Sequence, residues 1–253
     1  MGAQITNNAL PYTGVTGRQD LAPSPAQASV SSGVVLEASG LAFAPDAACT
    51  ASPLQLAGKR CMDLVLAALA LVALAPLLLF VAIAVKLTSP GPVLFVQQRP
   101  GRAGRLFPML KFRTMYAHLG DRTGLQQTVK NDQRVTPIGN FLRRSSIDEL
   151  PQLANIVLGH MSLVGPRPHP VHILAGGMDY EQLVPYYRQR WAMRPGLSGW
   201  AQVHGLRGPT DQAGPAIARI NHDLAYIQNF SLLLDFKVIV ATIRREFLGG
   251  SGF

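Results

Sequence analysis

The sequence predicts a membrane-associated protein of mixed α/β class, mainly helical. Residues 64–85 carry no charge, and 22 residues are enough for the roughly 20 that a bilayer core requires. The rest alternates short extended runs with helical segments. Lys and Arg outnumber Asp and Glu by 23 to 14, yet only 15% of residues are charged, against roughly 25% in a soluble domain. This composition excludes a disordered polyelectrolyte, a coiled coil and a freely soluble cytosolic enzyme.

Residues 1–58 are predicted to be a flexible, low-charge tail. They hold four charges and consist mostly of Ala, Ser, Gly, Pro, Thr and Asn. No apolar period of 2 or 3.6 persists through them, so no strand or helix is expected.

Residues 59–86 are predicted to form the membrane segment. Pro76 lies in the middle of the run, where it removes a backbone hydrogen bond and kinks a helix. Basic residues flank both ends, which by the positive-inside rule places both ends in the cytoplasm. A re-entrant helix that enters one leaflet, breaks at Pro76 and returns satisfies both observations. A single span with a tolerated proline is the alternative.

Residues 87–253 are expected to form the folded domain on the cytoplasmic side. A strand is predicted over 93–96 and another over 111–115, with Lys111 and Arg113 together on one solvated face. Helices are predicted over 148–158, 179–192, 215–228 and 232–248. The last is either a core helix or an amphipathic helix on an anionic membrane surface.

The pair Asp148–Glu149 is the strongest candidate for chemistry. Asp148 suits the N-cap of the helix at 148–158, with Pro151 in its first turn, and capping alone would explain it. However, Arg143 and Arg167 are close in sequence. Carboxylates together with cations are what phosphoryl transfer requires.

Arg167 lies between Pro166 and Pro168. Two prolines stiffen the backbone from which the guanidinium projects, and a planar guanidinium suits a phosphate. A rigid surface turn is the simpler interpretation. Basic charge can also indicate nucleic-acid binding. The sequence contains no known DNA- or RNA-binding module, so we expect no nucleic acid among the partners.

Several motifs occur in a fixed order along the chain. They are Lys59-Arg60-x-x-Asp63, Pro90-Gly91-Pro92, Gln98-Arg99, residues 111–115 (KFRTM), 134–139 (RVTPIG), 148–153 (DELPQL), 165–168 (GPRP), 195–202 (PGLSGWAQ) and 223–227 (DLAYI). Together they resemble the bacterial sugar transferase family, the monotopic phosphoglycosyl transferases that begin exopolysaccharide, capsule and O-antigen synthesis. The resemblance covers residues 59–253.

The resemblance implies transfer of a sugar-1-phosphate from a UDP-sugar to undecaprenyl phosphate, with Mg²⁺ and release of UMP. It implies that Asp148 is the nucleophile, that Asp148 and Glu149 bind the metal, and that Lys111, Arg143 and Arg167 contact phosphate. It also implies a re-entrant helix broken at a proline and a catalytic domain on the cytoplasmic face of the bacterial inner membrane. The family often has a serine before this proline, where this chain has Ala75.

The segment from Trp200 to Asp211 is similar to the subgroup that transfers glucose-1-phosphate, with galactose-1-phosphate as the second choice. Homo-oligomers and downstream glycosyltransferases are further partners consistent with the resemblance. Two alternatives stay open: a glycosyl transferase that releases UDP, and a non-catalytic membrane scaffold of a polysaccharide assembly complex.

Overall fold

The computed structural model describes residues 34–36, 41–44, 49, 51–121, 126, 128–129 and 131–248. Most of the expected flexible tail lies outside these residues. About half of the described residues are helical, and the strands pair two by two, so the predicted mixed α/β class with mainly helical content is confirmed.

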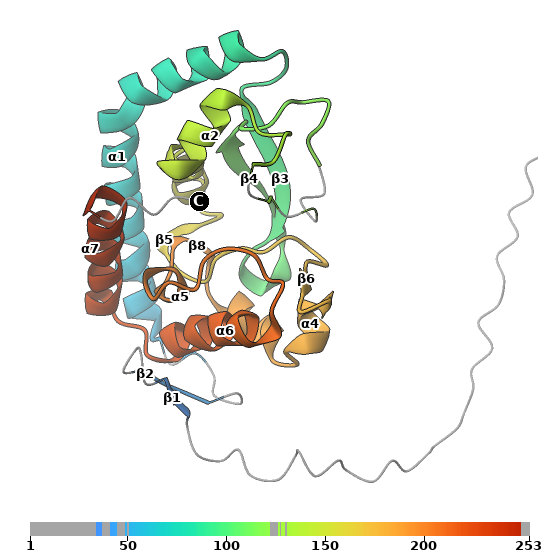
Figure 1. Cartoon of the computed structure of the whole chain (residues 1–253). Coiled ribbons are helices and arrows are strands. Elements are labelled where there is room, and N and C mark those ends of the chain that lie inside the picture. The colour runs from blue at the N-terminus through green and yellow to red at the C-terminus, as the bar shows by residue number, and fades with distance from the viewer. Residues whose placement is uncertain are drawn as a thin grey trace, which may run out of the picture. The chain divides into compact units, whose positions relative to one another are not determined.

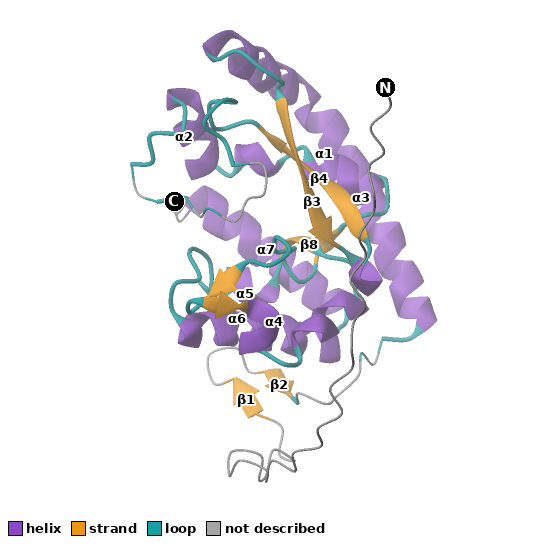
Figure 2. Ribbon diagram, turned by 90° about the vertical axis from the view of Figure 1, so that its right-hand side faces the viewer, coloured by secondary structure: helices purple, strands orange, loops and turns teal. Residues whose placement is uncertain are grey.

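The helices and strands occur in the following order along the chain. They are β1 (Val34–Leu36), β2 (Leu41–Phe43), α1 (Pro53–Thr88), β3 (Leu94–Pro100), β4 (Leu106–Phe112), α2 (Pro137–Arg144), α3 (Gln152–Val157), β5 (Ser162–Val164), β6 (Leu174–Ala175), β7 (Met178–Asp179), α4 (Tyr180–Leu183), β8 (Gly196–Ser198), α5 (Trp200–Val203), α6 (Ala213–Gln228) and α7 (Leu232–Leu248). β3 and β4 form an antiparallel hairpin (Figure 2), while β5 and β8 are parallel.

The long helix α1 begins six residues before the predicted boundary at Lys59. Ser52 caps it: its hydroxyl accepts from the Gln55 backbone N–H at 3.2 Å, and the Gln55 side chain accepts from the Ser52 N–H at 2.8 Å. This reciprocal pair satisfies two helix N–H groups, and Pro53 suits the first helical position. The last six residues of the predicted tail, 53–58, therefore belong to α1. The expectation of no strand in residues 1–58 is also wrong, because β1 and β2 form a hairpin and Phe43 is buried in the core.

Pro76 bends α1 without interrupting it. The helix is continuous from Pro53 to Thr88, so the predicted break is a bend. Figure 1 shows the second half of α1 running in a different direction from the first. A proline inside a helix costs one hydrogen bond and forces the axis to turn, while the turns on either side stay helical.

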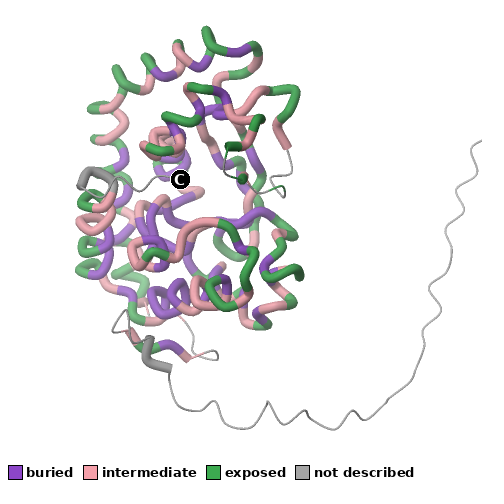
Figure 3. The backbone as a smooth tube through the Cα atoms, in the orientation of Figure 1, coloured by how far each residue is buried: buried purple, intermediate pink, exposed green. Residues whose placement is uncertain are grey.

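Both halves of α1 pack against the folded domain. In the first half, Ala67 and its neighbours contact α3 and β4 through Leu153, Ile156 and Phe107. In the second half, Val81 and Val85 contact α2 and the end of β4. Most of the remaining α1 residues are exposed or half-buried (Figure 3), and only 11% of its most apolar 18-residue stretch is buried. A core helix of a soluble protein would bury most of its surface.

Arg113 holds the C-terminal end of α1 and is buried, which corrects the prediction of a solvated basic face. β4 ends at Phe112, so the strand alternation does not extend to Arg113. Its guanidinium donates to the carbonyl oxygens of Val85 (3.2 Å), Ser89 (2.7 Å) and Pro90 (2.6 Å). A cation at this position satisfies free carbonyls and the negative end of the helix dipole.

The helices predicted over 215–228 and 232–248 are confirmed as α6 and α7. The helix predicted over 179–192 is divided into α4 and a 3₁₀ turn, Tyr187–Ala192. The cause is Pro185, which disfavours helical geometry in the preceding residue. Val184 is accordingly extended, with φ −128° and ψ 95°.

Arg113→Lys should lower the stability of the protein, because one ammonium cannot reach three carbonyl oxygens held by a planar guanidinium. We expect a loss of about 1–3 kcal/mol, the cost of buried acceptors left unpaired, measured as a lower Tm in detergent. Arg188→Lys is the matched control, since Arg188 is 71% exposed in its pair with Glu181 and such pairs contribute little. Equal shifts in the two variants would contradict the assignment.

Candidate active site

Asp148 and Glu149 lie in a 3₁₀ turn, Ile147–Glu149, between α2 and α3. Ser146, directly before the turn, has φ 54°, a left-handed conformation that is uncommon for a residue other than glycine. The prediction that Asp148 is the N-cap of the following helix is wrong. The helix α3 begins at Gln152, and Pro151 occupies the cap position without a side-chain hydrogen bond. The Asp148 side chain is therefore not occupied by capping.

Glu149 is bound by two of the predicted cations. Lys111 Nζ lies 2.8 Å from Glu149 Oε1, and Arg167 donates from Nη1 to Oε2 at 3.0 Å and from Nη2 to Oε1. Burial alone would raise the pKa of Glu149, but Arg167 and Lys111 hold it well below its usual range. Glu149 is therefore ionised at neutral pH, and it fixes the positions of both cations.

Asp148 has the opposite environment. Its side chain is buried, with the residue 7% exposed, and no donor among the described residues hydrogen-bonds to it. Burial raises the pKa of Asp148 to about 6, and the negative charge of Glu149 also raises it, whereas Lys111, Arg143 and Arg167 lower it. A carboxylate that is poorly solvated and carries no hydrogen bond keeps its lone pairs available for a new bond.

Arg143 lies at the C-terminal end of α2, close enough to Asp148 to lower its pKa. Its Nη1 donates to Thr128 Oγ1 at 2.9 Å, and no carboxylate in the described part of the chain pairs with it. The structure thus brings together the five residues that the sequence singled out: Lys111, Arg143, Asp148, Glu149 and Arg167.

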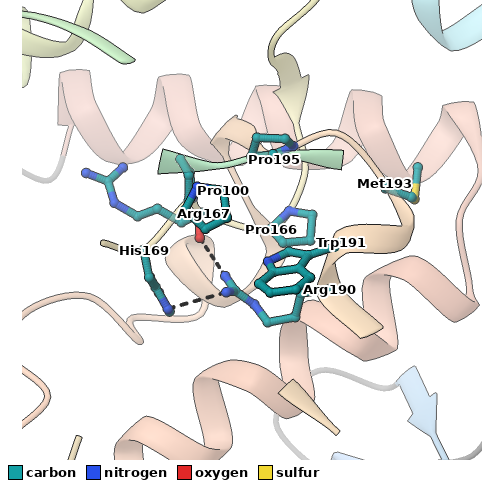
Figure 4. Close-up of a pocket in the computed structure, with 10 residues that line it drawn as sticks. Pro100, Pro166, Arg167, His169, Arg190, Trp191, Met193 and Pro195 are labelled. Atoms are coloured by element: carbon teal, nitrogen blue, oxygen red, sulfur yellow. Dashed lines mark hydrogen bonds between the residues drawn. The ribbon is translucent and has the colours of Figure 1, made fainter. Parts of the chain in front are cut away.

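Two arginines that sequence analysis did not single out as functional hold the backbone around Arg167. Arg190 Nη2 donates to the Arg167 carbonyl oxygen at 2.5 Å, and Arg99 Nη1 donates to the Pro168 carbonyl oxygen at 3.1 Å. Figure 4 shows the Arg167 carbonyl oxygen facing Arg190, with the Arg167 guanidinium pointing away from Trp191. Arg99 belongs to the Gln98-Arg99 motif, so the sequence contained a feature that could have marked it as a residue of the site.

The site carries more positive than negative charge. The carboxylate of Asp148 lies close to Lys111, Arg143 and Arg167, and that of Glu149 lies close to Lys111, Arg167 and Arg99. Burial, followed by repulsion from Arg167, lowers the pKa of Arg99 to about 9, which leaves it protonated at neutral pH. Excess cations in a partly buried site favour an anionic ligand with several charges, such as a diphosphate.

The carboxylates fit Mg²⁺ only if substrate completes the coordination. Mg²⁺ commonly binds one or two carboxylates together with substrate phosphates and water. No group of three or more His, Cys, Asp and Glu side chains converges among the residues that the structure describes. The Asp148 oxygens accept no hydrogen bond within the described ranges, whereas both Glu149 oxygens accept bonds from Lys111 or Arg167. The pair therefore suits a metal shared with a diphosphate.

Comparison with known proteins agrees with this geometry, since residues 54–249 match the family described as bacterial sugar transferase. The chain belongs to this family. It is 54% identical over 195 residues to the exopolysaccharide production protein PSS of Rhizobium leguminosarum bv. phaseoli, a match that covers 77% of this chain and 98% of that protein.

Two further relatives are named UDP-glucose:undecaprenyl-phosphate glucose-1-phosphate transferase. The protein from Caulobacter vibrioides is 48% identical over 185 residues, which is 73% of this chain and 68% of that protein. The protein from Xanthomonas campestris pv. campestris is 49% identical over 187 residues, 74% of this chain but only 38% of that longer protein. This chain is a sugar transferase, and the site described above lies within the matched region.

Asp148→Asn should stabilise the protein at pH 7.5 by about 1–3 kcal/mol, because it removes a buried charge without a hydrogen bond. Between the ordinary pKa of 3.8 and about 6, the native state binds more protons than the unfolded state, so wild-type stability falls as pH rises through this window. The gain from the substitution should be complete above pH 6 and vanish toward pH 4. Thermal unfolding in detergent with EDTA measures it.

Glu149→Gln is the matched control for this measurement. It removes the partner of Lys111 and Arg167, so it should destabilise the protein at pH 7.5. Shifts of the same sign in both variants would mean that the two carboxylates do not have opposite environments.

Proposed function

We propose that this protein transfers a sugar-1-phosphate from a UDP-sugar to undecaprenyl phosphate through a covalent intermediate on Asp148. The observation that supports this most directly is the contrast within the dyad. Asp148 is buried and accepts no hydrogen bond from the residues that the structure describes, while its neighbour Glu149 is held by Lys111 and Arg167. One carboxylate is thus available as a nucleophile, and the other organises the cations.

The first step attacks the phosphorus that carries the sugar. An Asp148 oxygen forms a bond to this phosphorus, the bond to the oxygen that bridges the two phosphates breaks, and UMP leaves with that oxygen and its electron pair. Arg167, Lys111 and Arg143 face the charge that moves onto UMP. Asp148 is deprotonated above pH 6 and needs no separate base.

The second step returns Asp148 to its starting state. A phosphate oxygen of undecaprenyl phosphate attacks the same phosphorus, the Asp148–phosphorus bond breaks, and the sugar diphosphate lipid is formed. Dividing the transfer lets a water-soluble donor and a lipid acceptor use one site in turn.

Mg²⁺ is the metal that we propose for the site, held by the diphosphate together with Asp148 and Glu149. When bound, it supplies positive charge that neutralises the phosphate oxygens. The basic side chains have their own part in the reaction: Arg167 and Lys111 orient the diphosphate, and Arg143 lies beside Asp148.

We further propose that α1 is re-entrant in the cytoplasmic membrane, with its exposed apolar face in lipid. Both ends of α1 are bound to one folded domain: Lys59 pairs with Asp235 at 2.6 Å near its start, and Arg113 bonds to Ser89 at its end. A helix that crossed the bilayer would have to place these two contacts on opposite sides. The bend at Pro76 agrees with entry and return on one side.

Glucose is the first choice for the sugar and galactose the second. The relatives from Caulobacter and Xanthomonas carry glucose-1-phosphate transferase in their names, and the segment from Trp200 to Asp211 resembles the same subgroup. Exopolysaccharide synthesis is the pathway class, in line with the name of the Rhizobium relative.

The test is nucleotide release by nanodisc-held protein with undecaprenyl phosphate, Mg²⁺ and a panel of UDP-glucose, UDP-galactose and UDP-N-acetylgalactosamine. We expect UMP from one donor, most of it from UDP-glucose. Asp148→Asn should reduce release by at least about 10³-fold, because an amide cannot act as the nucleophile. Membrane extraction and Tm confirm that the variant is folded.

Other products would overturn the proposal in distinct ways. UDP in place of UMP would indicate a glycosyl transferase that retains both phosphates on the nucleotide. Wild-type turnover in Asp148→Asn would eliminate the covalent step. No nucleotide from any donor, together with normal polysaccharide in cells that carry Asp148→Asn, would indicate a scaffold.

The topology of α1 is tested with single cysteines at its two ends. Leu54→Cys and Leu87→Cys suit this purpose, since these leucines are 83% and 80% exposed, in a background where Cys49 and Cys61 are replaced by serine. A membrane-impermeant maleimide should label neither site in intact spheroplasts and both after permeabilisation. Labelling of one site alone in intact cells would establish a crossing helix.

A further inference from the structure

A buried ion pair lies beneath the loop that carries Arg167. Asp223 on α6 and Arg190 in the Tyr187–Ala192 turn are 1% and 4% exposed. Arg190 Nε donates to Asp223 Oδ2 at 2.9 Å, and Arg190 Nη2 lies 2.8 Å from the same oxygen. Neither residue has a role in the chemistry proposed above.

The other side of the Arg190 guanidinium faces the loop. Nη2 donates to the Arg167 carbonyl oxygen at 2.5 Å, and Nη1 lies 3.3 Å from His169 Nδ1. Because arginine can only donate, we assign His169 Nδ1 as the acceptor, which puts the ring proton on Nε2, and the Tyr187 hydroxyl at 3.1 Å can donate to the same nitrogen. Burial lowers the pKa of His169 well below its usual value, in agreement with this assignment. One guanidinium therefore links Asp223 on α6 to residues 167 and 169. Figure 4 shows its bonds to the Arg167 carbonyl oxygen and to His169.

The contact with the Arg167 carbonyl fixes a dihedral angle that Pro168 restricts only to a range. A residue before proline is confined to the extended region, with ψ of about +120° to +160°, and within that range ψ of Arg167 still varies. That angle sets the direction of the Arg167 carbonyl, which Arg190 holds. The Arg167 side chain itself is 35% exposed, and Glu149 is the carboxylate that fixes its far end. The direction in which the Arg167 side chain leaves the main chain depends on the backbone conformation of Arg167.

We propose that Asp223 and Arg190 are positioning residues of the transfer reaction, which act on the donor phosphate through the backbone of Arg167. Asp223 neutralises and orients Arg190, Arg190 fixes the carbonyl of Arg167, and the Arg167 guanidinium is thereby directed toward the departing UMP. This inference rests on the function proposed above.

A double-mutant cycle tests the connection, with Asp223→Asn, Arg167→Gln and the combined variant. Asparagine keeps the shape of Asp223 but removes its charge. In the wild-type background, Asp223→Asn should reduce kcat for UMP release at least about tenfold with a smaller change in KM, because Arg167 contacts strengthen as charge develops on UMP. In the Arg167→Gln background the same substitution should change kcat less than about twofold.

Asp235→Asn is the matched control. Asp235 is 0% exposed and pairs with Lys59 at 2.6 Å, but it lies on α7, and within the described part of the chain it makes no hydrogen bond to residues 165–169. We expect a lower Tm with kcat within about twofold of the wild type, and an unchanged effect in the Arg167→Gln background. Arg190→Lys is the second variant for the cycle if Asp223→Asn does not fold, since lysine keeps the charge and loses the planar donor set.

Independent effects of the Asp223 and Arg167 substitutions, with their fold-changes multiplying in the combined variant, would overturn the inference and make the ion pair purely structural. An equal loss of kcat in Asp235→Asn would do the same. If the wild type releases no UMP, the proposed function fails first, and the inference falls with it. If the wild type is active and only the coupling is absent, the inference alone is wrong.

Discussion

The ion pairs of Glu149 are the interaction on which the site depends. One carboxylate receives Lys111 from the end of β4 and Arg167 from the loop after β5, so two segments that are far apart in the sequence meet at the turn between α2 and α3. Removing charges from water is costly unless each is paired. Because Glu149 compensates its two cations, Asp148 can be buried beside it with no hydrogen-bond donor of its own among the described residues.

The carboxylate pair and its cations could be predicted from the sequence, because Asp148, Glu149 and Arg143 are neighbours and Arg167 follows shortly after. The local geometry could not. The left-handed conformation of Ser146 turns the chain before Asp148, which removes Asp148 from the cap position that its sequence context favoured. Arg113 was misplaced for a similar reason: the strand pattern gives no sign that β4 ends at Phe112.

Long-range support was also not visible in the sequence. Arg190 and Asp223 are separated by 33 residues, and their pairing depends on how the Tyr187–Ala192 turn packs against α6. For the membrane segment, most features could be predicted from the sequence. Its length, flanking charges and central proline were all readable, yet the continuity of α1 through Pro76 depends on the helical turns on either side of the missing hydrogen bond.

The two contacts of α1 with the domain have a mechanical consequence. Its first half packs against Leu153 and Ile156 of α3, while its second half belongs to the same cluster as Ile147, the residue directly before Asp148. The turn that carries Asp148, the proposed nucleophile, therefore lies between two elements that pack against α1. With α1 in the bilayer as proposed, the depth of this helix determines how far Asp148 lies from the lipid phosphates.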